Sequence, residues 1–340
     1  MKKIFIAAMA LAAVAACNKS EIVSVSEGNA IAFDNAFVDN ATKSVNDPSY
    51  SSAEGGKMFT DFQVYGFVEG APLFGTDGKL VVKNNNLNSE LSSAWQYEGT
   101  QYWIAGAKYN FAAVAPATGW TKTDASKGGV SLSFINDGTH DVLYAQSAEI
   151  TGRTDGNEVV AFTFRHILSK VKFSFENGYN ASTATIKVEN IKINNAFKIG
   201  NVALTNAATT WSNQAGEVAL DFGAAVADNA DTDADAYAYG NTLESYNELL
   251  LIPSDATDYQ ISFDVKLYVS EELIKTYNHT AVANFAPVAG NCYDIKAVIN
   301  AENIDPENEQ EPIEFTVTAI TGWAGPTDQD ATVNQNTGNN

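Results

Sequence analysis

Basic residues are scarce in this chain. Only 20 Lys+Arg oppose 41 Asp+Glu, which gives a formal net charge of −21, and the only arginines are Arg153 and Arg165. Nucleic-acid binding and polybasic attachment to anionic lipid both depend on clustered Lys and Arg. The composition therefore excludes both modes, and no nucleic-acid partner is expected.

Cysteine and the short motifs of catalysis are equally sparse. Cys17 and Cys292 are the only cysteines, and His140, His166 and His279 lie far apart in the sequence. No metal-binding helix motif, nucleophile elbow or phosphate-binding loop occurs. After modification of Cys17 no internal disulfide could form, and Cys292 is interpreted as a structural thiol at a strand start. We therefore predict no enzymatic activity, no metal site and no cofactor.

One acidic run resembles the beginning of a calcium loop. Asp231, Asp233 and Asp235 alternate as the first ligands of such a loop do, but Ala236 replaces the turn glycine and Thr242 the bidentate glutamate. The run is interpreted as a solvated acidic loop, with calcium binding as the open alternative.

Helical periodicity is nearly absent, whereas apolar and polar residues alternate throughout. Ile261, Phe263, Val265 and Leu267 share one face of a predicted strand. Other predicted strands are 61–68, 108–114, 130–135, 159–164, 171–175, 186–193, 293–299 and 313–320. Leu243 to Leu250 is the single predicted helix. The sequence predicts an all-β protein.

Two domains are expected from the length and from one polar interruption. Residues 151–158 have no large apolar side chain, and we place the junction there. The expected N-terminal domain is 30–152 and the C-terminal domain 159–325, followed by a disordered tail at 326–340. On this division Arg153 and Arg165 lie beyond the strands of the first domain.

The first residues have the order of an export signal. Lys2 and Lys3 precede an apolar run from Ile4 to Ala16, too short to span a bilayer. Small residues then lead to Cys17, as in the lipobox of bacterial lipoproteins. We predict a signal peptide at 1–16, lipidation of Cys17 and a tether over 17–29. The expected location is the outer membrane, anchored through this lipid, and the cell surface.

Aromatic residues are concentrated in the middle of the predicted first domain. They are Trp95, Tyr97, Tyr102, Trp103, Tyr109, Phe111 and Trp120. Core packing of strands is the favoured interpretation, because aromatic rings dominate β-sandwich cores. An exposed platform for a glycan is the alternative, and would suit a monomeric glycan-binding surface lipoprotein.

Six segments of the chain carry recognisable patterns. The most extensive is 95–116, with the pattern W.Y....YW..G..Y.F.A.AP. The other blocks are 61–67, 164–173, 250–253, 293–299 and 313–323. In chain order the six resemble the fimbrillin family, the lipoprotein pilins of anaerobic Gram-negative bacteria. The resemblance covers nearly all of the chain after Cys17.

The resemblance implies two tandem transthyretin-like β-sandwich domains and a structural role in a surface fimbria that mediates adhesion. In that family a protease removes the first strand of the N-terminal domain, and a C-terminal strand of a neighbouring subunit fills the groove. The implied partners are other fimbrial subunits, outer-membrane lipid and a surface ligand of host or bacterium. Strand addition of this kind gains affinity from main-chain hydrogen bonds and register from alternate side chains.

Both strands can be assigned here. Ile31, Phe33 and Phe37 mark a removable strand within 30–43. The donor strand would present Ile313, Phe315, Val317 and Ala319. Alternation alone also allows 313–320 to be the last strand of its own sandwich.

Processing is where the sequence departs from the family pattern. No arginine follows Val38, so an Arg-specific protease has no site there. Lys43 occupies the corresponding polar stretch, and cleavage after it would leave Ser44 as the first residue. The open alternative is a subunit that stays uncut and acts as a membrane-proximal anchor.

Overall fold

Strands make up most of the chain in this computed structural model. It describes residues 29–38, 51–52, 57–58, 60–83, 95–153, 159–181, 184–227, 237–256, 258–304, 311–320 and 331–332. Within these residues the one α-helix is the single turn α2 (Ala301–Ile304). The all-β prediction is confirmed.

The first sheet has nine strands in the described part of the chain. Its order is β1-β13-β11-β8-β4-β6-β7, with β12 paired to β8 and β5 to β4. The bounds are β1 (Phe33–Val38), β4 (Asp61–Val68), β5 (Ala71–Pro72), β6 (Lys79–Lys83), β7 (Trp95–Gln96), β8 (Lys108–Ala115), β11 (Leu143–Gln146), β12 (Ile150–Thr151) and β13 (Val160–His166). Strand β1 lies at one edge and runs parallel to β13.

A second sheet of twelve described strands has the order β20-β19-β15-β16-β17-β14-β21-β22-β23. Off this path, β10 pairs with β15 and β9, and β18 pairs with β14. The bounds are β9 (Trp120–Ser126), β10 (Gly129–Ile135), β14 (Ser169–Asn177), β15 (Ala184–Leu204), β16 (Thr209–Ala227), β17 (Thr242–Ser245), β18 (Leu249–Leu251), β19 (Asp258–Val269), β20 (Glu272–Asn284), β21 (Cys292–Ile299), β22 (Phe315–Ile320) and β23 (Ala331–Thr332). Strands β2 (Ser51–Ser52) and β3 (Lys57–Met58) form a separate pair.

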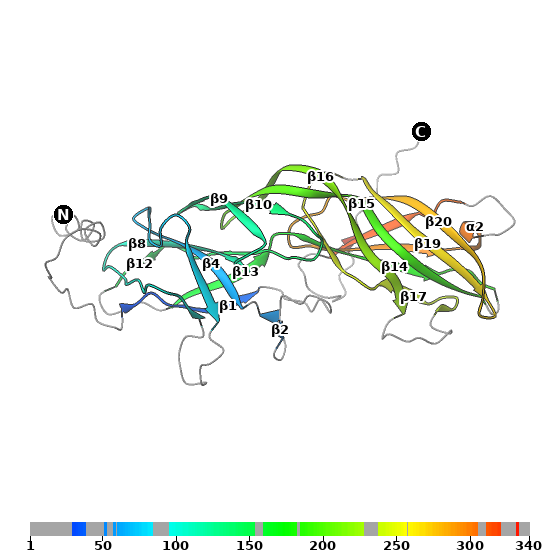
Figure 1. The fold of residues 1–340 in the computed structure, drawn as a ribbon, viewed down its shortest axis with the longest axis horizontal. Coiled ribbons are helices and arrows are strands. Elements are labelled where there is room, and N and C mark those ends of the chain that lie inside the picture. Colours follow the sequence, from blue (N-terminus) through cyan, green and yellow to red (C-terminus); the bar gives the residue numbers. More distant parts are fainter. Residues whose placement is uncertain are drawn as a thin grey trace.

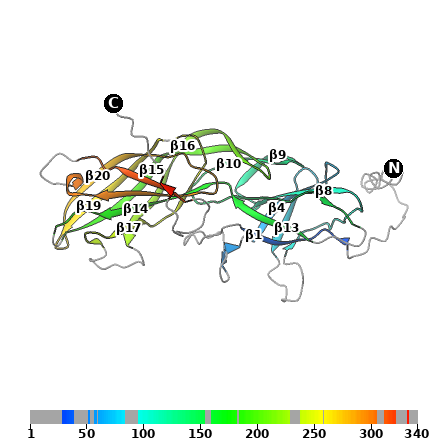
Figure 2. The same cartoon turned by 180° about the vertical axis from the view of Figure 1, so that it is seen from behind.

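The strands form an elongated molecule, with β8 and β12 at one end and β19, β20 and α2 at the other (Figure 1). The reverse view shows the same order along the long axis (Figure 2). The long strands β15 and β16 run from the second sandwich to β10 in the middle of the molecule (Figure 1). Near its start β15 contributes Ile186 and Val188 to one core, and near its end Val202 and Leu204 to another. Two sandwiches are therefore joined by continuous strands.

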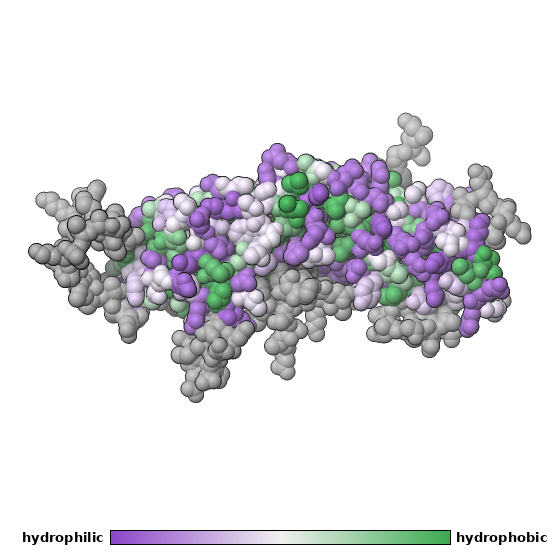
Figure 3. All heavy atoms as spheres, in the orientation of Figure 1, coloured by the Kyte–Doolittle hydropathy of each residue, from purple (hydrophilic) through white to green (hydrophobic). Residues whose placement is uncertain are grey.

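Three apolar cores account for this arrangement. One fills the second sheet's own sandwich and includes Phe173, Phe263 and Phe315. The other two cover opposite faces of the first sheet, because alternate residues of a strand point to opposite sides. On β4, Phe62 and Val64 face one core while Tyr65 and Phe67 face the other. The visible surface is mostly polar, with apolar residues in small separate groups (Figure 3).

The predicted helix at Leu243 to Leu250 is wrong. This segment forms β17 and β18, which both pair with β14. Leu243 and Leu249 are buried between the layers of the second sandwich, and that burial outweighs the weak helical preference of the segment.

Apart from β9 and β10, which belong to the second sheet, and the separate pair β2 and β3, the strands up to His166 pair in the first sheet, and those from Ser169 onward pair in the second. The predicted junction at 151–158 comes earlier in the chain. Strand β13, which follows that junction, pairs with β1 and β11 of the first sheet. Arg165 is thus on a strand of the first sheet and not beyond it.

In the described residues no helix is long and apolar enough to cross a membrane.

Candidate assembly site at two strand edges

Phe33, the first residue of β1, closes one core of the first sheet. Its ring is 1% exposed. It contacts the rings of Phe62, Phe74, Tyr97, Phe111 and Phe162 at centroid distances of 6.2, 6.3, 5.5, 5.8 and 5.8 Å. These partners come from β4, β8, β13 and the segments beside them. An edge strand therefore supplies the central side chain of this aromatic cluster.

The segment before β1 is held mainly by backbone contacts. The amide of Ile31 donates to the carbonyl of Gln101 at 2.8 Å, and the hydroxyl of Tyr97 donates to the carbonyl of Ile31 at 2.7 Å. The amide of Val160 on β13 donates to the carbonyl of Ala32 at 2.8 Å. Ile31 itself is 1% exposed. The site that holds this segment therefore binds the backbone of a strand and buries two apolar side chains, Ile31 and Phe33.

The pairing of β1 is irregular after Phe33. Phe33 lies opposite Val160 and Asp34 opposite Ala161, but the register shifts before Phe37, which lies opposite Thr163. A shift of this kind is a β-bulge, which interrupts the alternation of facing residues. The structure describes the backbone of Phe37 and not its side chain.

The predicted donor strand β22 lies close to one edge of the second sheet. It pairs antiparallel with β21 without a register shift. Ile313, Phe315 and Val317 are 4%, 7% and 6% exposed, and Ala319 packs beside them. The ring of Phe315 contacts those of Phe173, Phe175 and Phe263. In this chain, β22 thus completes the core of its own sandwich.

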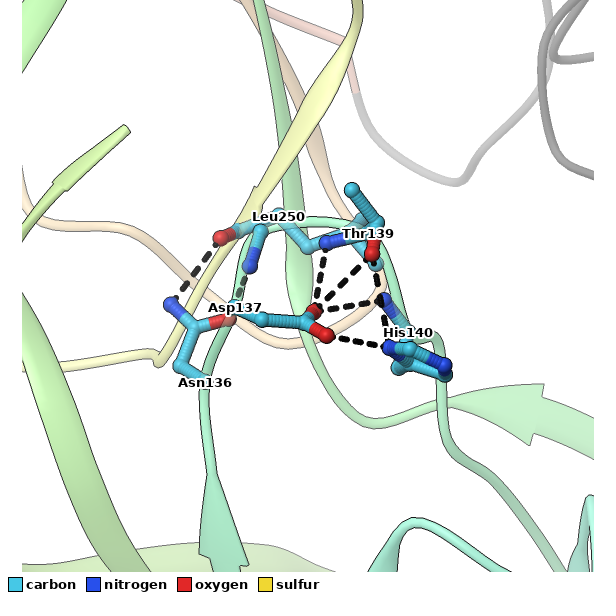
Figure 4. Close-up of polar contacts among 6 residues, drawn as sticks. Asn136, Asp137, Thr139, His140 and Leu250 are labelled. Carbon is cyan, nitrogen blue, oxygen red and sulfur yellow. Dashed lines mark hydrogen bonds and ion pairs between the residues drawn. The ribbon is translucent and has the colours of Figure 1, made fainter. Parts of the chain in front are cut away.

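The loop between β10 and β11 joins the two halves of the molecule. The side-chain amide of Asn136 donates to the carbonyl of Leu250 at 3.1 Å, and Asp137 accepts hydrogen bonds from the amides of Thr139 and His140 (Figure 4). The carboxylate of Asp137 also contacts the imidazole of His140. The contacts of Asp137 shape the turn, and that of Asn136 ties it to β18, so this loop is structural.

The histidines do not assemble into a catalytic or metal site. His166 contacts buried Asp141 at 2.5 Å, His140 is exposed, and His279 lies in the core of the second sandwich. Within the described residues no group of three or more His, Cys, Asp or Glu is placed to hold a metal ion.

The aromatic cluster predicted from the sequence is mostly core. Trp95, Trp103, Tyr109 and Phe111 are at most 5% exposed, whereas Tyr102 is 38% exposed. The remaining two rings, Tyr97 and Trp120, are partly buried and donate hydrogen bonds to backbone carbonyls. The rings therefore do not form a flat exposed platform for a glycan.

Cys292 is the first residue of β21, as predicted, and is partly buried. Burial raises the pKa of its thiol to about 11. The predicted lipidation site Cys17, the predicted cleavage site Lys43 and the acidic run Asp231, Asp233 and Asp235 lie outside the described residues. The signal peptide at 1–16 and most of the tail at 326–340 lie outside them as well.

Solved structures of similar fold include fimbrial proteins. A fimbrial protein from Bacteroides vulgatus aligns with a TM-score of 0.54 at 15% identity, over 87% of this chain and 99% of that chain. The fimbrial anchor protein Mfa2 from Porphyromonas gingivalis aligns with a TM-score of 0.33 at 13% identity, over 81% and 95%. No curated protein matches in sequence.

The match to a protein-family model spans most of the strands. The model of the fimbrillin-like family matches residues 53–323, a span that begins before β4 and ends just after β22. The chain belongs to the fimbrillin-like family.

Proposed function

We propose that this protein is a structural subunit of a surface fimbria that mediates adhesion. It is exported as a lipoprotein with lipid attached to Cys17. It then loses its first strand by cleavage after Lys43 and polymerises by β-strand exchange. Its partners are further fimbrial subunits, which join at the groove left by residues 30–43. Lipid attachment and cleavage are carried out by other enzymes, and strand exchange itself needs no cofactor or catalytic group of this chain.

The observation that carries the proposal is the position of Phe33. A five-ring pocket in the core of the first sheet is closed by one residue of an edge strand. Removal of that strand would expose Phe62, Phe111 and Phe162 to water. Reburying a large apolar side chain gains about 1.5 to 3 kcal/mol. The open groove would therefore favour capture of another apolar strand.

The second supporting observation is that the donor candidate β22 lies close to a sheet edge. It bonds along one side to β21 and, within the described residues, along the other side to the two residues of β23. Exposed strand edges readily pair with other chains. Transfer of β22 to a neighbour would replace its apolar contacts in its own sandwich with apolar contacts in the neighbour's groove. It would also uncover Phe173, Phe175 and Phe263, so the donating sandwich needs another strand in that place.

Lysine processing distinguishes two roles within the proposal. Lys43 follows β1 by a short polar stretch, and cleavage there would separate the whole of 30–38 from the body of the protein. A chain that stays intact would keep its groove closed and would act as a terminal anchor. The N-terminal residue of the mature surface protein decides between these roles: acylated Cys17 indicates the anchor or a precursor, and Ser44 a processed subunit.

Electron microscopy tests the central proposal on three kinds of cell. The first produces the full chain, the second a chain with residues 313–323 deleted, and the third neither. We expect fibres only with the full chain. Because β22 also completes the core of its own sandwich, the deletion should be less stable, and circular dichroism of the purified deletion chain controls for loss of the fold. A Lys43→Gln chain should remain at the outer membrane with an intact N-terminus. Fibres of normal length from the deletion would contradict strand donation. The buried aromatic cluster gives no support to the alternative of a monomeric glycan-binding lipoprotein.

A further inference from the structure

Two distant segments of the chain have the same apolar pair. Ile31-Ala32-Phe33 enters β1, and Ile313-Glu314-Phe315 enters β22. Ile31 and Phe33 are each 1% exposed, and Ile313 and Phe315 are 4% and 7% exposed. The removable strand and the donor strand thus bury the same two side chains at the same spacing.

We propose that the incoming strand of a second copy runs parallel to β13, with Ile313 in the place of Ile31 and Phe315 in the place of Phe33. This inference rests on the proposed function, and it adds the direction, the register and the recognised residues of the exchange. Its partner is a second copy of this chain.

The pockets of the two phenylalanines are chemically alike. Phe33 is surrounded by five aromatic rings, and Phe315 by Phe173, Phe175 and Phe263 at 5.9, 6.0 and 5.8 Å. The three contacts of Phe315 are edge-to-face, whereas those of Phe33 are edge-to-face, tilted or stacked. Ring contacts of these kinds favour aromatic over aliphatic side chains. Phe315 is the only aromatic residue of β22. It is therefore the residue of that strand that fits the pocket of Phe33.

The backbone contacts around Ile31 fix the direction. Tyr97 and Gln101 bond to the carbonyl and amide of Ile31, and Val160 bonds to the carbonyl of Ala32. A strand that presents Ile313 and then Glu314 in the same direction offers the same amide and carbonyls in the same order. Reversal would reverse that order along this site, so the three bonds favour the parallel arrangement.

Pro312 is compatible with this register although proline has no amide hydrogen. It would take the place of Ala30, which forms an isolated bridge with Tyr102. The two hydrogen bonds of that bridge use the amide of Ile31 and the carbonyl of Asn29, so the amide of Ala30 takes no part. A proline is tolerated where the strand position needs no donor.

Beyond the phenylalanine the donor strand is more regular than the strand it replaces. With Phe315 opposite Val160, its unshifted alternation would bring Val317 opposite Phe162 and Ala319 opposite Phe164. Val160, Phe162 and Phe164 are buried and belong to one core. In β1 the shift between Asp34 and Phe37 breaks this sequence of facing pairs. The donor would therefore extend the apolar contact along β13.

Disulfide trapping between subunits tests direction and register together. In a Cys292→Ser background, Ala161→Cys is combined with Thr316→Cys, the residue that would lie directly opposite it. The matched controls combine Ala161→Cys with Glu314→Cys, which is opposite in an antiparallel strand, or with Thr318→Cys, which is displaced by two residues. Disulfides need Cα atoms about 4.4 to 6.8 Å apart, so only an opposite pair links readily. All three donor positions are exposed or half-buried.

Under oxidising conditions, fibres with the Ala161 and Thr316 cysteines should give a ladder of covalent oligomers that a reductant removes. Fibres with either control pair of cysteines should give no such ladder. Linking only through the Glu314 cysteine would overturn the parallel direction, and linking only through the Thr318 cysteine would overturn the register. Either result leaves strand exchange intact. Fibres that form without residues 313–323 would overturn the proposed function itself.

Discussion

The ring of Phe33 lies on the ring of Phe162 with the centroids 5.8 Å apart and the planes at 16°. This stack joins β1 to β13 at the centre of a buried core. We expect Phe33→Ala to destabilise the uncleaved chain by about 3 to 5 kcal/mol, the usual cost of truncating a buried phenylalanine. Urea-induced unfolding followed by tryptophan fluorescence measures this change.

Leu80→Ala is a suitable control, because Leu80 on β6 is 48% exposed and its loss should change stability by no more than about 0.5 kcal/mol. Cleavage after Lys43 would remove Phe33 from the mature subunit. Fibres built from Phe33→Ala precursor should then be as stable as the unmodified ones. Equal unfolding midpoints for Phe33→Ala and Leu80→Ala would show that β1 does not close this core.

The thiol of Cys292 should be nearly inert in the folded chain. Burial raises its pKa from 9.0 to about 11, so its thiolate population at mildly alkaline pH falls about 100-fold. A Cys17→Ser chain leaves this single thiol for the measurement. We expect alkylation by iodoacetamide to be roughly 100-fold slower in buffer than in guanidinium chloride. Similar rates in both would place Cys292 at an open surface.

His279 should make the second sandwich sensitive to acid. Its side chain is 8% exposed, its ring lies 5.4 Å from that of Phe263, and its Nε2 has no hydrogen-bond partner within the described structure. Burial lowers the pKa of His279, with the charge of Asp264 acting in the opposite direction. The folded state therefore disfavours the protonated ring.

The sign of the pH dependence follows from this lowered pKa. Above about pH 6.5 the ring is neutral in both states, and the stability is unchanged. Below that pH the unfolded chain binds a proton more readily, so stability falls until the lowered pKa of the folded state is reached. His279→Phe, which keeps the ring contact with Phe263, should remove this loss. The measurement is the loss in free energy of unfolding between pH 7.5 and pH 5.5, compared between the unmodified chain and His279→Phe. Equal losses in the two chains would refute the prediction.

Arg165 should hold the β15–β16 hairpin against the first sheet. Its guanidinium donates to the carbonyls of Thr205 and Ala208 at 2.5 and 3.2 Å and lies 5.0 Å above the ring of Tyr144. We expect Arg165→Ala to cost about 1.5 to 3 kcal/mol, the usual range for a hydrogen bond to a charged group. Arg165→Lys should recover only part of this, because an ammonium cannot reproduce the planar fork.

Hydrogen exchange at the hairpin residues 205–208 provides the local measurement for Arg165. Faster exchange there, with unchanged exchange in β19 and β20, would support the role. Uniformly faster exchange would indicate a general loss of stability instead.

The sequence predicts strands well where one face is buried. Ile261, Phe263 and Val265 alternate with polar residues because β19 has one wet face, and the structure confirms this strand. Strands β9 and β20 were not predicted, since both are edges with exposed polar residues such as Thr123 and Lys275. Pairing with a neighbour, rather than their own apolar pattern, makes them strands.

The candidate site could be predicted only in part. The alternation of Ile31 and Phe33 indicates an apolar strand, and the buried positions of both residues agree with it. The five-ring pocket of Phe33 could not be predicted, because its walls come from β4, β8, β13 and two loops brought together by the fold. The shift before Phe37 was also missed, since a bulge depends on the partner strand and leaves no clear pattern in a single strand.

Assembled fibres should survive low salt and dilution. With a net charge of −21, subunits repel one another, and this repulsion grows as the Debye length rises from about 8 Å at physiological salt to about 30 Å at 0.01 M. Strand exchange would oppose it with buried contacts such as those of Ile313, Phe315 and Val317, which salt barely screens. We therefore expect sedimentation of purified fibres in 0.01 M buffer to recover nearly all subunits in the pellet. Release of soluble subunits under that condition would mean that exposed contacts, and not a buried strand, hold the fibre together.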